Sequence, residues 1–307
     1  MTSDSGASDL TLTIDMSARS LPGRDAAYQR LAALLASAIP NPARVELVLT
    51  DRFEHVAGEF ATQSPTRSNP NMTAADYRAV KGDGAVAAAR TIDLPDDKVV
   101  VVIPAGLLGA NQRILRRTIL HEAQHVTLFQ KHNSAQAVHR RTDFEIPADQ
   151  LTWEYMWIAE SAIDEFRCER TMHARGMGAA HNTYSAGYGP IIAMFDTARQ
   201  TYRGTFDLTD TYHRAFAALD RLAVFLAYGA ASVAAERVAP DMWSAVTPMA
   251  ELLGVLGDIP GTDTTVGDDE LTGLSLGLAL WLRQQFRANG FDYRYTSTGS
   301  DYFELLW

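Results

Sequence analysis

Residues 98–131 read KVVVVIPAGLLGANQRILRRTILHEAQHVTLFQK, and this stretch decides the fold. It opens with the β-branched run Lys98 to Pro104, which predicts a strand because such side chains pack well on a pleated sheet. A turn region at 106–109 follows, and Gln112 to Lys131 then has the residues and the apolar spacing of a helix. The sequence therefore predicts a strand that leads into a long helix.

This helix contains the motif HEAQH at residues 121–125. His121 and His125 are four residues apart, so they lie one above the other on one helical face and can chelate a single Zn²⁺. Glu122 lies about 100° around the helix from His121, close enough to take a proton from a water molecule beside the metal. The motif predicts His121 and His125 as metal ligands and Glu122 as the general base.

A catalytic zinc ion needs a third protein ligand and keeps its fourth position for water. The helix predicted for Trp153 to Arg175 offers Glu165 and Glu160. These two are five residues apart, about 140° around a helix, so both cannot face one metal from an unbroken helix. We favour Glu165, because it shares a stripe with the apolar Ile158 and Ala162 and can face the core. Glu160 remains the alternative third ligand.

The segment Glu165-Phe166-Arg167-Cys168-Glu169-Arg170 resembles the third-ligand helix of two gluzincin families, the CAAX prenyl proteases and the heat-shock membrane proteases. The resemblance covers the strand, the HExxH helix and this helix. It implies that Glu165 binds the metal and that Glu169, where those families usually have Asp, steadies a metal-binding histidine. The segment Glu160 to Asp164 is similar instead to the E-x-x-x-D segment of thermolysin-type enzymes, which implies Glu160 as the ligand.

Catalysis of this kind also needs a donor aimed at the charge that develops in the transition state. Candidate donors gather in the segment HNTYSAGYG at residues 181–189. The candidates are His181, Tyr184 and Tyr188, and of these we expect His181 or Tyr184 to be the donor. The lone Cys168 lies inside a predicted helix and is interpreted as a small buried residue.

The order of these elements predicts an α+β fold, in which a zincin-like core with a small sheet over the HExxH helix precedes a mostly α-helical lobe. The minigluzincins, which are small cytoplasmic gluzincins, are similar to this core. We expect a flexible tail at 1–20, the metallopeptidase core at 21–190 and the helical lobe, packed on the core, at 191–307. A second strand is predicted for Val45 to Thr50, and further helices for 25–39, 191–202, 209–238, 243–256 and 270–289. The aromatic C-terminus is expected to dock on the body.

The amino-acid composition of the chain limits the classes of partner and of metal site that it can have. The chain has 27 Lys and Arg against 37 Asp and Glu, and its net charge of −10 disfavours nucleic acid. A single cysteine excludes an intramolecular disulfide and Cys-rich metal sites. The N-terminus lacks the pattern of a secretion signal, so a cytoplasmic location is expected. The longest apolar stretch, Leu222 to Ala235, is shorter than the roughly 20 residues that cross a bilayer, so no membrane partner is expected.

These patterns predict zinc-dependent hydrolysis of peptide bonds, with a peptide or protein as substrate. A strand before the HExxH helix is the arrangement in which zincins align an extended peptide by backbone pairing. The alternatives are a zinc-stabilised regulator or degenerate protease that binds a protein partner, and a hydrolase of non-peptide amides. The sequence does not predict the oligomeric state.

Overall fold

The computed structural model describes residues 10–15, 24–65, 89–109, 111–138, 142, 145–147, 150–178, 187–237, 243, 246, 248–296 and 300–306. Within these residues the chain forms two compact units, which divide between His132 and Asn133. The boundary predicted from the sequence, at residue 190, lies inside the second unit. The fold class is α+β: a small mixed sheet in the first unit, and helices in most of the second.

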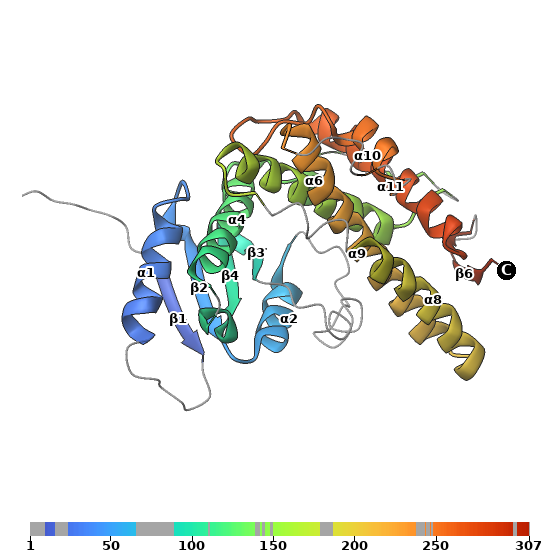
Figure 1. The fold of residues 1–307 in the computed structure, drawn as a ribbon, viewed down its shortest axis with the longest axis horizontal. Helices are drawn as coiled ribbons and strands as arrows, with labels where there is room; N and C mark the ends of the chain where they lie inside the picture. Colours follow the sequence, from blue (N-terminus) through green and yellow to red (C-terminus); the bar gives the residue numbers. More distant parts are fainter. Residues whose placement is uncertain are drawn as a thin grey trace, which may run out of the picture. The chain divides into compact units, whose positions relative to one another are not determined.

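Among the described residues, the first unit is built on a four-stranded sheet with the order β1-β2-β4-β3 (Figure 1). β1 (Thr11–Asp15), β2 (Val45–Thr50) and β4 (Lys98–Pro104) are parallel, and β3 (Arg90–Leu94) runs antiparallel to β4. The helices are α1 (Arg24–Ala36), α2 (Phe53–Gln63) and α4 (Gln112–Gln130), and the 3-10 turns are η1 (Pro42–Arg44), η2 (Pro95–Asp97) and η3 (Ala105–Gly109).

Side chains of the central strands alternate between the two faces of the sheet, as the two-residue period of a strand requires. On β4, Val99, Val101 and Ile103 pack in one apolar cluster with residues of α1 and α4. Val100 and Val102 pack in another cluster with residues of α2. The sheet is therefore covered on both faces, which explains why β4 is a continuous apolar run rather than an alternating one.

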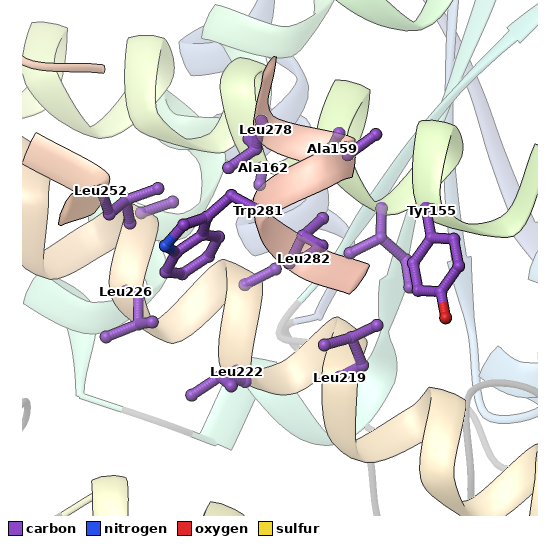
Figure 2. Packing of buried hydrophobic residues seen from close by; sticks show 14 of the residues in the cluster. Tyr155, Ala159, Ala162, Leu219, Leu222, Leu226, Leu252, Leu278, Trp281 and Leu282 are labelled. Atoms are coloured by element: carbon purple, nitrogen blue, oxygen red, sulfur yellow. The ribbon is translucent and has the colours of Figure 1, made fainter. Parts of the chain in front are cut away.

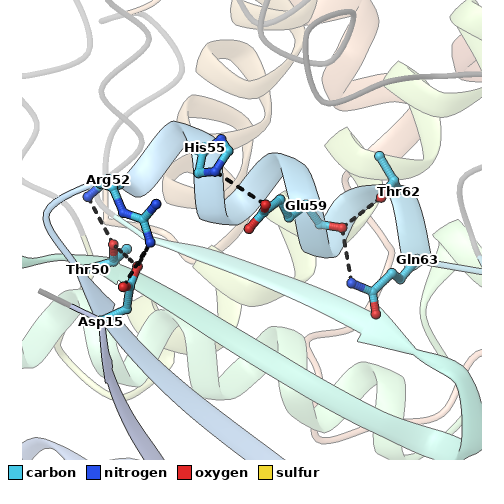
Figure 3. A network of polar contacts seen from close by, with 7 residues as sticks. All are labelled: Asp15, Thr50, Arg52, His55, Glu59, Thr62 and Gln63. Carbon is cyan, nitrogen blue, oxygen red and sulfur yellow. Dashed lines mark hydrogen bonds and ion pairs between the residues drawn. The ribbon is translucent and has the colours of Figure 1, made fainter.

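A polar network joins the carboxyl ends of β1 and β2 to the start of α2 (Figure 3). The buried Thr50 hydroxyl donates to Asp15 Oδ2 at 3.1 Å and accepts from the backbone N–H of Arg52 at 2.9 Å. The Arg52 guanidinium forms an ion pair with the same Asp15 carboxylate at 2.8 Å. Along α2, His55 and Glu59 form a further pair at 3.3 Å. The network fixes the ends of two neighbouring strands relative to each other.

The second unit is mostly helical in its described part (Figure 1). Its elements are η4 (Ala135–Ala137), α6 (Trp153–Ala174), α8 (Tyr188–Thr205), α9 (Leu208–Ala234), α10 (Pro248–Leu256), α11 (Asp268–Ala288), β5 (Phe291–Tyr295) and β6 (Asp301–Leu305). Helix α6 packs against α9 and α11, and both α8 and α10 contact α9.

The apolar core of this unit gathers between these helices (Figure 2). Its buried members include Tyr155, Ala159 and Ala162 from α6, Leu219, Leu222 and Leu226 from α9, Leu252 from α10, and Leu278, Trp281 and Leu282 from α11. The indole N–H of Trp281 donates to Glu251 Oε2 at 2.8 Å, so the polar atom of this large ring has a partner.

The chain closes with a hairpin of β5 and β6 that adds aromatic rings to the same core. Phe303 stacks on Phe291, with ring centroids 6.0 Å apart, and meets Tyr212 of α9 edge to face at 5.6 Å. The expectation that the aromatic C-terminus docks on the body is confirmed. The sequence did not predict that it docks as a pair of strands.

The long elements agree with the prediction. β2 and β4 have the predicted bounds, and α4 and α6 each end one residue before the predicted end. The prediction of a flexible tail is wrong at Thr11–Asp15, because these residues form β1 and pair with β2. The short elements α2 and β3 were not predicted.

Among the described residues, helix α9 has the length and the apolar composition to cross a membrane. In the 18-residue apolar segment of α9 that could cross a membrane, 67% is buried inside the protein, as expected for a core helix. The buried residues include Leu219, Leu222 and Leu226 of the cluster in Figure 2.

Two glycines, one on α9 and one on α11, differ in how closely other side chains pack against them. A Cβ atom at Gly229 would lie 2.5 Å from the Trp243 ring, whereas one at Gly277 of α11 would meet nothing within 4 Å. Gly229→Ala is expected to lower the free energy of unfolding by about 1–3 kcal/mol, because overpacking outweighs helix propensity. Gly277→Ala is expected to raise it by up to about 1 kcal/mol. Urea unfolding followed by circular dichroism measures both; a gain of stability in both variants would contradict the packing argument.

A buried carboxyl gives this unit a pH dependence. Burial raises the pKa of Glu154 above its ordinary value of 4.5, although the Tyr212 hydroxyl donates to its carboxylate. Because its pKa is raised in the folded state, this carboxyl contributes to stability below about pH 4.5. That contribution is lost as the pH rises through the pKa of the folded state. Glu154→Gln stays neutral, so its stability relative to the natural chain is expected to increase between about pH 4.5 and 7. Thermal unfolding over this range checks the trend; an unchanged difference would contradict it.

Candidate metal centre

Helix α4, which carries the HExxH residues, has defined ends. At its start the Asn111 side chain accepts a hydrogen bond from the backbone N–H of Arg113 at 2.8 Å. At its end His132 has a positive φ of 50°, a conformation that does not continue a right-handed helix. Residues 118–128 are all buried. Polar side chains in this segment therefore need partners.

The packing of α4 on the sheet sets the direction of the motif. Ile119, Ala123 and Val126 belong to the cluster on the α1 and α4 face of the sheet. Their spacing of four and three residues defines one side of the helix. His121 and His125 share a second side, which is turned about 160° from Ala123 by helical geometry. The motif therefore presents its imidazoles away from the apolar contact with the sheet.

The two imidazoles converge. The Nε2 atoms of His121 and His125 lie 3.3 Å apart, and both side chains are buried. This separation exceeds the usual N–H hydrogen-bond length of about 2.9–3.0 Å. Two nitrogens bound to tetrahedral zinc at about 2.0–2.1 Å are separated by about 3.3–3.4 Å. The spacing of the two rings therefore fits a shared zinc ion.

Glu122 is held by the neighbouring strand. The hydroxyl of Thr91, on β3, donates to Glu122 Oε2 at 2.7 Å. Thr91 pairs with Val101 of β4, whose side chain is on the α4 face of the sheet, and so the Thr91 side chain points to α4 as well. The carboxylate of Glu122 is thereby fixed through one of its two oxygens.

Other buried polar residues of α4 bond to their own helix. Gln124 donates to the carbonyl of Leu120 at 3.0 Å, and Thr127 donates to the carbonyl of Ala123 at 2.8 Å. Such bonds satisfy a polar side chain without involving another element. Glu122 differs from Thr127 in this respect, because the hydroxyl that bonds to Glu122 lies on a strand.

In the second unit, three acidic side chains of α6, those of Asp164, Glu165 and Glu169, have different partners. Glu165 is half-buried and accepts a hydrogen bond from the Tyr228 hydroxyl of α9, 2.9 Å from Oε2. Glu169 is fully buried and lies 3.6 Å from His173 one turn later. Glu169 therefore has a histidine partner, His173, on its own helix.

Asp164 accepts two hydrogen bonds that link α6 to the start of η4. Its carboxylate accepts from the Ser134 hydroxyl at 2.5 Å and from the backbone N–H of Ala135 at 2.9 Å. It thus caps η4 and holds the segment that follows His132 in the chain. Asp164 is the final acid of the thermolysin-like E-x-x-x-D segment. Both of its hydrogen-bond partners, Ser134 and Ala135, lie in the second unit.

Arg167, one turn after Asp164, is also buried and anchors a loop. Its guanidinium donates to Asn133 O and Asn133 Oδ1, both at 2.7 Å, and to Thr264 O at 2.8 Å. Burial lowers the pKa of the guanidinium, whereas the charge of Asp164 opposes that shift. Asn133 completes the network by donating to Val266 O at 2.7 Å.

Among the described residues, His121 and His125 of the first unit and Glu165 of the second have side chains that could bind a metal ion. The group includes Glu165, which we favoured as third ligand, and not Glu160, which is buried within the second unit. The predicted donors His181 and Tyr184 lie outside the described residues.

Two residues that sequence reasoning missed contact the site residues. Thr91 lies on a strand too short to be recognised from its pattern, so its position opposite Glu122 was hidden. Tyr228 lies 63 residues after Glu165 on a helix that was predicted, but no spacing rule connects the two. Only the packing of α6 against α9 brings them together.

Comparison of the chain with protein-family models, with curated proteins and with solved structures yields no match. The function of the chain is therefore inferred from the chemistry of these residues.

The ligand assignment predicts a difference between two acids of α6. Glu165→Gln is expected to weaken zinc binding at least about 100-fold, since even the partners of metal ligands contribute 10- to 100-fold. Glu160→Gln is expected to bind zinc as the natural chain does. Competition with a chromophoric chelator measures both affinities, and circular dichroism checks that each variant is folded. The reverse result would make Glu160 the third ligand, and a natural chain that binds no zinc would overturn the site.

Proposed function

We propose that the chain is a zinc-dependent metallopeptidase, in which His121, His125 and Glu165 hold Zn²⁺ and Glu122 is the general base. The observation that carries the proposal is the 3.3 Å separation of the two imidazole nitrogens, which suits tetrahedral zinc. The adjacent Glu122 adds the group that hydrolysis needs. A structural zinc site has four protein ligands, whereas the proposed set has three among the described residues and would leave a position for a reactant.

A bound zinc ion supplies a Lewis acid that makes water a nucleophile near neutral pH. The Thr91 hydroxyl bonds to Glu122 Oε2, and a carboxylate accepts at both oxygens, so Oε1 can receive the proton of the attacking water. Glu122 then transfers this proton to the nitrogen of the leaving amine as the peptide bond breaks. Thr91 acts as a positioning residue, because it limits the rotation of the carboxylate during both transfers.

A peptide is the substrate class that the sheet favours. In the described sheet β3 is an outer strand, and it carries Thr91, which bonds the general base. The backbone of an outer strand can pair with an extended peptide. A peptide paired along β3 would have a peptide bond close to Glu122, because Thr91 of β3 lies within one hydrogen bond of the Glu122 carboxylate.

The proposal predicts that binding and catalysis separate at Glu122. Glu122→Gln keeps the size of the side chain and its hydrogen bond from Thr91 but cannot accept a proton at neutral pH. Zinc affinity is expected to remain, while kcat for cleavage of a fluorescence-quenched peptide pool falls by about 10²- to 10⁴-fold. Glu59→Gln, at an exposed acid of the same unit, is the control and should retain activity.

Two results would contradict the proposal. Turnover that persists in Glu122→Gln would exclude the general-base role. A natural chain that binds one zinc ion and cleaves no peptide in the pool, but binds a protein tightly, would point to a zinc-stabilised binding protein instead.

A further inference from the structure

The partner of Glu165 extends the candidate site to α9. We propose that Tyr228 is a positioning residue that orients Glu165 for the metal; this inference rests on the proposed function. The Tyr228 hydroxyl donates to Glu165 Oε2 at 2.9 Å, a normal length for a hydrogen bond to a carboxylate. This bond limits the rotation of the carboxylate and so holds it in one orientation.

The packing of α6 and α9 explains why the hydroxyl reaches Glu165. Both helices contribute buried alanines to the core, among them Ala159 and Ala162 on α6 and Ala227 on α9 (Figure 2 labels the first two). Short side chains let two helices approach closely. The Tyr228 ring, one residue after Ala227, is half-buried. The position of its hydroxyl is therefore set by helix packing and not by a loop.

A phenol is suited to this task. It donates one hydrogen bond and remains neutral, so the carboxylate keeps its negative charge for the metal. A lysine or arginine at the same place would compete with the metal for that charge. Carboxylates that bind metals are themselves hydrogen-bonded, and loss of such a partner weakens metal binding about 10- to 100-fold.

The other acids of α6 support the assignment by contrast. Asp164 binds the Ser134 hydroxyl and the Ala135 N–H, and Glu169 lies against His173. Those contacts hold the backbone and the helix of the second unit. Glu165 instead bonds to a neutral donor from a neighbouring helix.

The test compares two tyrosines of α9 that bond to acids of α6. Tyr228→Phe removes the hydroxyl bonded to Glu165, and Tyr212→Phe removes the hydroxyl that donates to Glu154 Oε1 at 3.3 Å. Zinc affinity is measured by chelator competition with the full-length chain, at a temperature where both variants are folded by circular dichroism. We expect zinc affinity to fall about 10- to 100-fold in Tyr228→Phe and to be unchanged in Tyr212→Phe.

Each other result overturns the inference. If Tyr228→Phe binds zinc as tightly as the natural chain, the hydroxyl does not position the ligand. If zinc affinity is kept and only kcat falls, Tyr228 acts on the substrate instead. An equal loss of affinity in both variants would show that the effect arises from general destabilisation of the second unit. Failure of the proposed function is distinct, because it would appear in the natural chain as an absence of zinc binding or of cleavage.

Discussion

The rotation of α4 about its axis is the constraint on which the candidate site depends. Ile119, Ala123 and Val126 hold one side of this helix in the apolar cluster beneath the sheet. A rotation by one residue, about 100°, would remove these side chains from the cluster. Burial of a large apolar side chain contributes about 1.5–3 kcal/mol, so one rotation is strongly preferred. Residues without reactive groups thus determine where the imidazoles and the carboxylate of the motif point.

Buried charges impose a comparable order on α6. Asp164 and Arg167 are both buried, and an unpaired charge in that setting would be strongly destabilising. Each is bonded to backbone groups that follow His132 or lie in the loop before α11. These bonds fix the rotation of α6 about its own axis. In this orientation Glu165 lies next to α9 and accepts a hydrogen bond from it. Asp164, Glu165 and Glu169 can therefore share one helix, because each of the three has a different partner.

The sequence was most informative where a local pattern is strong. The β-branched run of β4 and the apolar period of α4 were predicted almost to the residue, and the HExxH spacing alone placed the imidazoles on one side of the helix. β1 and β3 were missed, because five-residue strands are stabilised by their partners and carry little pattern of their own. Thr91 and Tyr228 were missed for a related reason: hydrogen bonds across 31 and 63 residues depend on tertiary packing.

The buried amide of Asn133 also bears on the order in which the chain folds during synthesis. Its side chain bonds to Val266, 133 residues later, so this anchor cannot form until most of the chain has left the ribosome. The first unit completes earlier: the Gln130 side chain bonds to Asn41, and the strands lie between these positions or before them. Domains generally fold as units from the N-terminus. The sheet and α4 of the nascent chain are therefore expected to be folded before α6 is anchored. Arg167 of α6 can form its bond to Thr264 only after the loop before α11 has been synthesised.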